Sequence, residues 1–103
     1  MEPLLVITNV PAKDIAVSLA RELIERRLAA CVNILPSVHS VYRWEGKMEE
    51  ASEVMLLIKS FKKHYATLEK IICELHPYDL PEVIAVPISQ GLPAYLAWMA
   101  QET

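Results

Sequence analysis

The sequence predicts an α+β fold in which two helices cover one face of an antiparallel sheet. Three observations support this prediction. Apolar, β-branched runs stand at residues 4–10 and 83–88. Two stretches with helical periodicity stand at residues 12–27 and 62–75. Between the two helical stretches, residues 28–60 have the pattern of one very long β-hairpin.

The first strand is predicted over residues 4–10, and Pro11 ends it. A helix follows over residues 12–27, because Pro11 can stand in its first turn and Asp14 lies favourably near its positive end. The apolar residues of this helix recur at helical spacing and define its inward face. They are Ala16, Leu19, Ala20, Leu23 and Ile24.

The hairpin of residues 28–60 is predicted to turn at Glu45 and Gly46, which gives each arm about 14 residues, or ~45 Å. A compact domain of about 100 residues spans little more than ~30 Å. The tip, with Tyr42 and Trp44, therefore needs a second chain to cover its aromatic surface. This length predicts an obligate oligomer.

Proline residues mark a bulge, the end of the second helix and the start of the third. Pro36 cannot donate a sheet hydrogen bond, so a bulge is expected at Pro36–Ser37. Pro77 ends the helix of residues 62–75, and Pro93 stands in the first turn of a third, C-terminal helix. The second helix is predicted to turn five residues inward: Tyr65, Leu68, Ile71, Ile72 and Leu75.

The order βαββαβ with a C-terminal helix is the ferredoxin-like split βαβ plan, here a single domain over residues 1–103. Its strands are apolar at both parities, so the sheet face away from the helices also needs cover. This pattern is a second argument for association between chains.

Bulk composition excludes several classes of function. The net charge of −3 argues against a nucleic-acid binder. No apolar run approaches the ~20 residues that span a bilayer, and the first residues lack a secretory signal, so a cytoplasmic location is expected. Two cysteines match no zinc spacing, and two glycines are too few for a phosphate-binding loop, so no organic cofactor is expected.

Residues 76–82, His-Pro-Tyr-Asp-Leu-Pro-Glu, form the best polar cluster. His76 can ligate copper or zinc as a neutral imidazole, but a cationic cap at the helix end is the reading that the sequence favours. Cys31 is more typical of a small buried apolar residue than of a metal ligand or nucleophile. No nucleophile is accompanied by a general base and a residue that orients this base, so an enzyme is not predicted.

On the hairpin, Arg43 and Glu50 are expected to form a diagonal ion pair.

Four segments resemble the CutA family of divalent-cation tolerance proteins: LAACVN at 28–33, SVYRWEG at 40–46, HPYxxPE at 76–82 and YLAW at 95–98. The resemblance covers nearly the whole chain. It implies a ferredoxin-like subunit in a PII-like homotrimer, in which the long hairpin packs on neighbouring subunits. It also implies a role in tolerance of copper and other divalent cations.

Two kinds of site are predicted, and His76 is the one metal ligand that carries over from the family. The predicted metal ligands are His76 and Cys31, and the predicted ligand cleft or subunit interface contains Tyr42, Trp44, Tyr78 and Glu82. Some family members have a cysteine at the position of Thr8 and a second histidine at that of Leu75. Two functions stay open, a homotrimer that binds copper or another divalent cation and a PII-like regulator that binds a small ligand or partner protein at its interfaces.

Overall fold

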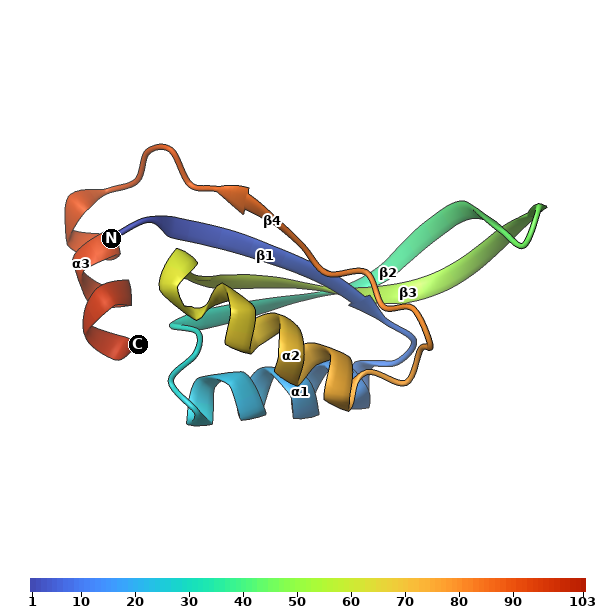
Figure 1. Ribbon diagram of the computed structural model, residues 1–103, viewed down its shortest axis with the longest axis horizontal. Coiled ribbons are helices and arrows are strands. Elements are labelled where there is room, and N and C mark those ends of the chain that lie inside the picture. Colours follow the sequence, from blue (N-terminus) through green and yellow to red (C-terminus); the bar gives the residue numbers. More distant parts are fainter.

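The computed structural model describes residues 1–103 as a four-stranded antiparallel sheet with two helices on one face and a third helix at one end (Figure 1). The strands lie in the order β2-β3-β1-β4, which confirms the ferredoxin-like plan. The elements in chain order are β1 (Pro3–Val10), α1 (Lys13–Glu25), β2 (Cys31–Trp44), β3 (Lys47–Phe61), a 3-10 turn (Lys62–His64), α2 (Tyr65–Leu75), β4 (Ile84–Pro87) and α3 (Pro93–Glu102).

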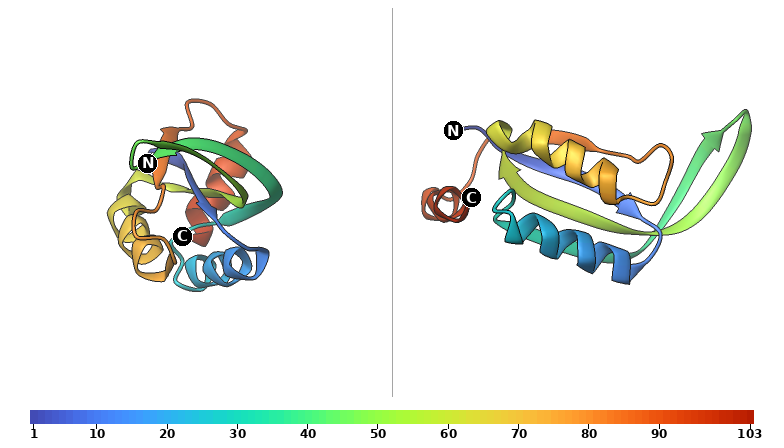
Figure 2. Two further views of the ribbon diagram at one scale, coloured as in Figure 1. Left: turned by 90° about the vertical axis from the view of Figure 1, so that its right-hand side faces the viewer. Right: turned by 60° about the horizontal axis from the view of Figure 1, so that its bottom comes forward.

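The core lies between the sheet and the helices α1 and α2, which run side by side beneath the strands (Figure 2). Fourteen buried apolar residues form it, and the cross-strand pair Val6–Ile58 is at its centre. Two predicted inward residues are exceptions, since Ile24 is 42% exposed and Leu75 is 46% exposed. Ile24 is turned about 100° away from Leu23, at the margin of the buried stripe. At the end of α2, His76 turns toward the sheet in place of Leu75.

The long hairpin is present, and the two predicted irregularities are confirmed. The register of β2 against β3 shifts between Leu35 and Val38, and Ser37 has a φ of 62°. Glu45 and Gly46 both have positive φ, as a two-residue type I′ turn requires. The part beyond the bulge projects past the end of β1, and the whole molecule is 45 Å long (Figure 1).

The predicted ion pair on the hairpin was wrong. Arg43 faces Met48 as expected, but its guanidinium contacts only the Gly46 carbonyl, at 3.3 Å. Glu50 pairs instead with His39 over 2.7 Å. His39 and Arg43 are both diagonal neighbours of Glu50, and the twist of a two-stranded ribbon brings one diagonal closer than the other.

The sheet face away from α1 and α2 carries partly exposed apolar side chains. They share one parity along the four strands: Leu5, Ile7, Leu35, Met55, Leu57, Ile84 and Val86. Helix α3 lies at one end of the sheet, where Tyr95 approaches Lys59 (Figure 1). None of the three helices has the length and apolar character needed to cross a membrane.

Candidate functional site

Polar side chains gather where β1 ends and the hairpin leaves the body of the sheet. The segment between α2 and β4 passes this point, since it must cross from the helical layer back to the edge of the sheet. Three hydrogen bonds join it to the strands: from His76 to Asn9, from Tyr78 to Glu53 and from Asn9 to Glu82. We call this group of five residues the hairpin-base cluster.

His76 links α2 to the end of β1. Its side chain is buried, with 7% of the residue exposed, and Nε2 donates to the Asn9 carbonyl over 2.7 Å. Nδ1 accepts the Tyr78 backbone N–H over 3.1 Å, so the proton is on Nε2 and the imidazole is neutral. His76 is the C-cap residue of α2, but its ring bonds β1 and not the carbonyls of its own helix. Both ring nitrogens are therefore occupied within the chain.

Tyr78 connects the same segment to the base of the hairpin. Its hydroxyl donates to Glu53 Oε2 over 3.0 Å, and its ring lies 4.7 Å from that of His76. Burial, followed by the hydrogen bond and charge of Glu53, raises the pKa of Tyr78 to about 12. Tyr42 adds a smaller effect of the same sign.

Glu53 is a buried carboxylate without a cation. It lies opposite Val38 beside the bulge, and 9% of the residue is exposed. The Tyr78 hydroxyl is its one hydrogen-bond donor, and none of the three ion pairs in the chain includes it. Burial of a carboxylate normally requires a compensating charge or several donors.

Asn9 and Glu82 complete the hairpin-base cluster. Asn9 is 7% exposed, and its Nδ2 donates to Glu82 Oε1 over 3.1 Å. The other amide atom, Oδ1, is buried without a partner. The cluster therefore contains two carboxylates and an unused amide oxygen, and no basic side chain is bonded to them.

The structure brings some of the predicted site residues together and separates others. Tyr42 and Trp44 share one face of the hairpin with Glu53, because alternate residues point the same way. Tyr78 contacts Glu53, which lies opposite Val38, whereas Tyr42 is four residues further along β2 and Trp44 is at the turn. Glu82 lies at the other side of the cluster, on Asn9.

Cys31 lies far from His76 within one chain. Cys31 pairs with Lys59, which in turn pairs with Leu5 of β1. The Asn9 carbonyl that binds His76 is four residues further along the strand, or about 13 Å. No group of three His, Cys, Asp or Glu side chains in the chain is arranged to hold a metal ion.

Sequence reasoning missed Glu53 and Asn9. A usable signal existed for Glu53, which is a carboxylate directly before the apolar run 54–58 and opposite the expected bulge. Asn9 offered a weaker signal, as an amide at the end of a buried apolar strand.

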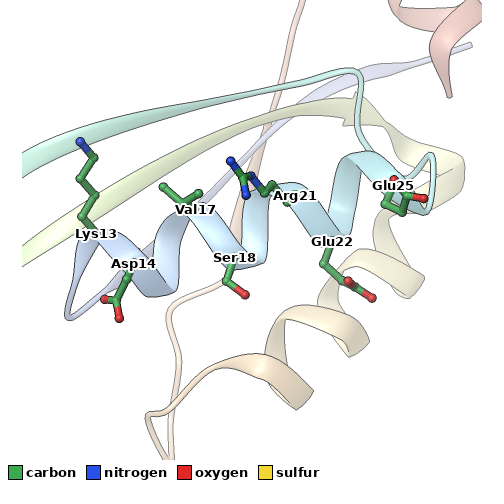
Figure 3. Close-up of a pocket in the computed structure, with 7 residues that line it drawn as sticks. All are labelled: Lys13, Asp14, Val17, Ser18, Arg21, Glu22 and Glu25. Atoms are coloured by element: carbon green, nitrogen blue, oxygen red, sulfur yellow. The ribbon is translucent and has the colours of Figure 1, made fainter.

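Two surface hollows lie away from the hairpin-base cluster. One follows the outer side of α1, where Lys13 and Arg21 alternate with Asp14 and Glu22 (Figure 3). Its charges are mixed, and Glu22 is already paired with Arg26 over 2.8 Å. The other is an apolar groove beside β4 and the start of α2, lined by residues that include Leu4, Tyr65, Ala85, Pro87 and Ile88.

The fold and the cluster define a ferredoxin-like α+β subunit with a projecting hairpin and a polar site at the hairpin base. Residues 4–102 match the family described as CutA1 divalent ion tolerance protein. The chain belongs to this family, and its role is accordingly in tolerance of divalent metal ions.

Individual relatives match 90% or more of this chain. The divalent-cation tolerance protein CutA of Thermus thermophilus is 43% identical over all of this chain and 99% of its own length. Protein CutA of the mouse is 45% identical over 90% of this chain, which spans 52% of the mouse protein. The solved structure of CutA1 from Oryza sativa has a TM-score of 0.97 at 41% identity, and the match covers 100% of this chain and 94% of that one.

Proposed function

We propose that this protein contributes to divalent-cation tolerance by binding the cation directly, as a cytoplasmic homotrimer, with copper the first cation to test. The observation that carries the proposal is the position of the hairpin-base cluster, beside a sheet face that one chain leaves uncovered. Neutral imidazole and carboxylate are divalent-metal ligands. The free thiols of Cys31 and Cys73 suit a reducing compartment.

The chain's own residues fit a divalent cation only when copies combine. Glu82 has a second carboxylate oxygen outside its bond to Asn9, and His76 can bind a metal if Nδ1 releases the Tyr78 N–H. Cys31 can join them only from another copy, given its place at the far end of the sheet. A homotrimer is supported by the uncovered apolar face and by the projecting hairpin.

Calorimetry with copper and zinc tests the proposal. We expect the wild-type protein to bind and Glu82→Gln and Cys31→Ser to weaken binding about tenfold or more. Glu74→Gln, an exposed site on α2, is the control and should bind as the wild type does. Unchanged affinity in a folded His76→Ala variant would remove His76 from the site. Absence of binding by the wild-type trimer would overturn the proposal.

The second candidate is a PII-like regulator that binds a small ligand or partner protein between subunits, without catalysis. Its support is that Tyr42 and Trp44 lie on the same face of the projecting hairpin as Glu53, which Tyr78 contacts at the base, since aromatic side chains with a few polar groups are typical of ligand sites. A ligand specific for the folded trimer raises its melting temperature. A metabolite panel that produces no shift would count against this candidate.

A further inference from the structure

We propose that Glu53 receives an ammonium or guanidinium group, so that the hairpin base is a binding site for a nitrogen cation. The proposal does not depend on metal binding. The first observation is Glu53 itself, a carboxylate of which 9% is exposed and to which only the neutral Tyr78 hydroxyl donates. Leaving such a group without a counter-charge is unfavourable, so the assembled protein is expected to supply one.

The polar groups of the hairpin-base cluster indicate which kind of cation would bind Glu53. The hydrogen bonds of the cluster leave the Asn9 Oδ1 buried and unpartnered, and Glu82 adds a second carboxylate. A group that suits such acceptors must be rich in donors and carry a positive charge, as ammonium and guanidinium do.

Aromatic rings favour a nitrogen cation over a bare metal ion at this point. The Tyr78 hydroxyl donates to Glu53, so its ring stands beside the carboxylate, and Tyr42 lies on the same face of the hairpin four residues closer to the tip than Val38, which is opposite Glu53. The faces of such rings attract ammonium and guanidinium groups. A metal ion would need more ligands than one buried carboxylate, and the chain offers no set of three.

Two sources can supply this chemistry, a free amine or a side chain of a second copy. The hairpin tip contains two cationic side chains, Arg43 and Lys47, that form no ion pair within their own chain. Arg43 reaches only the Gly46 carbonyl, at 3.3 Å, and Lys47 has no side-chain hydrogen bond or ion pair. Although Glu45, Glu49 and Glu50 stand in the same segment, Arg43 and Lys47 of one copy each carry a charge that complements Glu53 of another.

The first experimental arm tests a free amine on the full-length protein in EDTA, which removes metal ions. Agmatine, arginine and spermidine are titrated against the melting temperature, with sodium chloride at equal ionic strength as the control. If a free amine is the source, one probe gives a saturable rise that Glu53→Gln abolishes. Glu49→Gln, an exposed site on the same face of the same strand, should keep the response.

The second arm tests a side chain of another copy, by sedimentation equilibrium of Glu53→Gln, Arg43→Gln, Lys47→Gln and the double variants. If a copy supplies the cation, Glu53→Gln and one tip variant each weaken association about tenfold or more, and their combination weakens it no further. Glu53→Asp, which keeps the charge, is the rescue variant and should associate more tightly than Glu53→Gln. The proposal is overturned if no amine binds and no tip variant is coupled to Glu53.

Discussion

Tyr78 donates its hydroxyl to the Glu53 carboxylate over 3.0 Å, and this bond ties the segment after α2 to the base of the projecting hairpin. The two residues are 25 positions apart in the chain. The bond holds a neutral phenol against a buried carboxylate, and its strength therefore depends on the proton that Tyr78 keeps.

The first prediction concerns high pH. Burial and Glu53 raise the pKa of Tyr78 from 10.0 to about 12. The folded state holds the Tyr78 proton more tightly than the unfolded state does. The resulting stabilisation of the folded state is fully present below pH 10 and is lost as the pH rises to about 12. We expect the melting temperature to fall across this window, and to fall less in Tyr78→Phe. Tyr95→Phe, at a partly exposed tyrosine on α3, is the control, and identical pH profiles for wild type and Tyr78→Phe would contradict the prediction.

The second prediction concerns His76 as a structural link. Replacement by alanine leaves the Asn9 carbonyl and the Tyr78 N–H without their partners. We expect His76→Ala to lower the free energy of unfolding by about 2–3 kcal/mol in urea titrations, because a buried carbonyl and a part-buried N–H lose their hydrogen bonds. The neighbouring Leu75→Ala removes an exposed side chain and should cost clearly less. Equal costs would show that the ring does not hold the two segments together.

The sequence was sufficient for the elements whose signals are local. Pro36 has no N–H, and the bulge lies beside it. Glu45–Gly46 divides two arms of nearly equal length, and the turn is where that division predicts. The apolar parities of the strands likewise predicted the sheet face that one chain leaves uncovered. Each of these features depends on a few neighbouring residues.

The hairpin-base cluster was predicted only in part, because its bonds join distant positions. The segment 76–82 was recognised, but the partner of Glu82 is Asn9, 73 residues away. Whether Leu75 or His76 turns to the sheet depends on where α2 ends relative to β1. The burial of Glu53 likewise depends on a tyrosine from another layer. No periodicity along the chain encodes such contacts.

A third prediction concerns the end of α1. Arg27 has a φ of 57°. The Leu28 N–H donates to the Leu23 carbonyl and the Arg27 N–H donates to the Ile24 carbonyl, as in a Schellman motif. Glycine suits this position and a β-branched residue does not. We expect Arg27→Val to lower the free energy of unfolding by about 1–2 kcal/mol, and Arg27→Gly to be clearly more stable than Arg27→Val. Equal stabilities would contradict the role of the backbone angle.

A fourth prediction concerns Trp44, which is on the projecting part of the hairpin and is partly exposed in one chain. If the hairpin packs on neighbouring copies, Trp44→Ala removes an aromatic anchor and weakens association by more than about 2 kcal/mol. Light scattering over a dilution series measures this loss. Ile24→Ala, an exposed apolar site on α1, should leave the assembly unchanged. A Trp44→Ala assembly that survives dilution as the wild type does would contradict the prediction.

The last prediction concerns Thr8, which is fully buried in β1 opposite Leu56. Its hydroxyl oxygen has no hydrogen-bond partner, so folding removes it from water without compensation. Thr8→Val replaces the hydroxyl with a methyl group of similar size, and we expect the free energy of unfolding to rise by about 1 kcal/mol. Thr8→Ala leaves a cavity instead and should lower it. If Thr8→Val destabilises the protein as much as Thr8→Ala does, the buried hydroxyl is not an unsatisfied group and the prediction is contradicted.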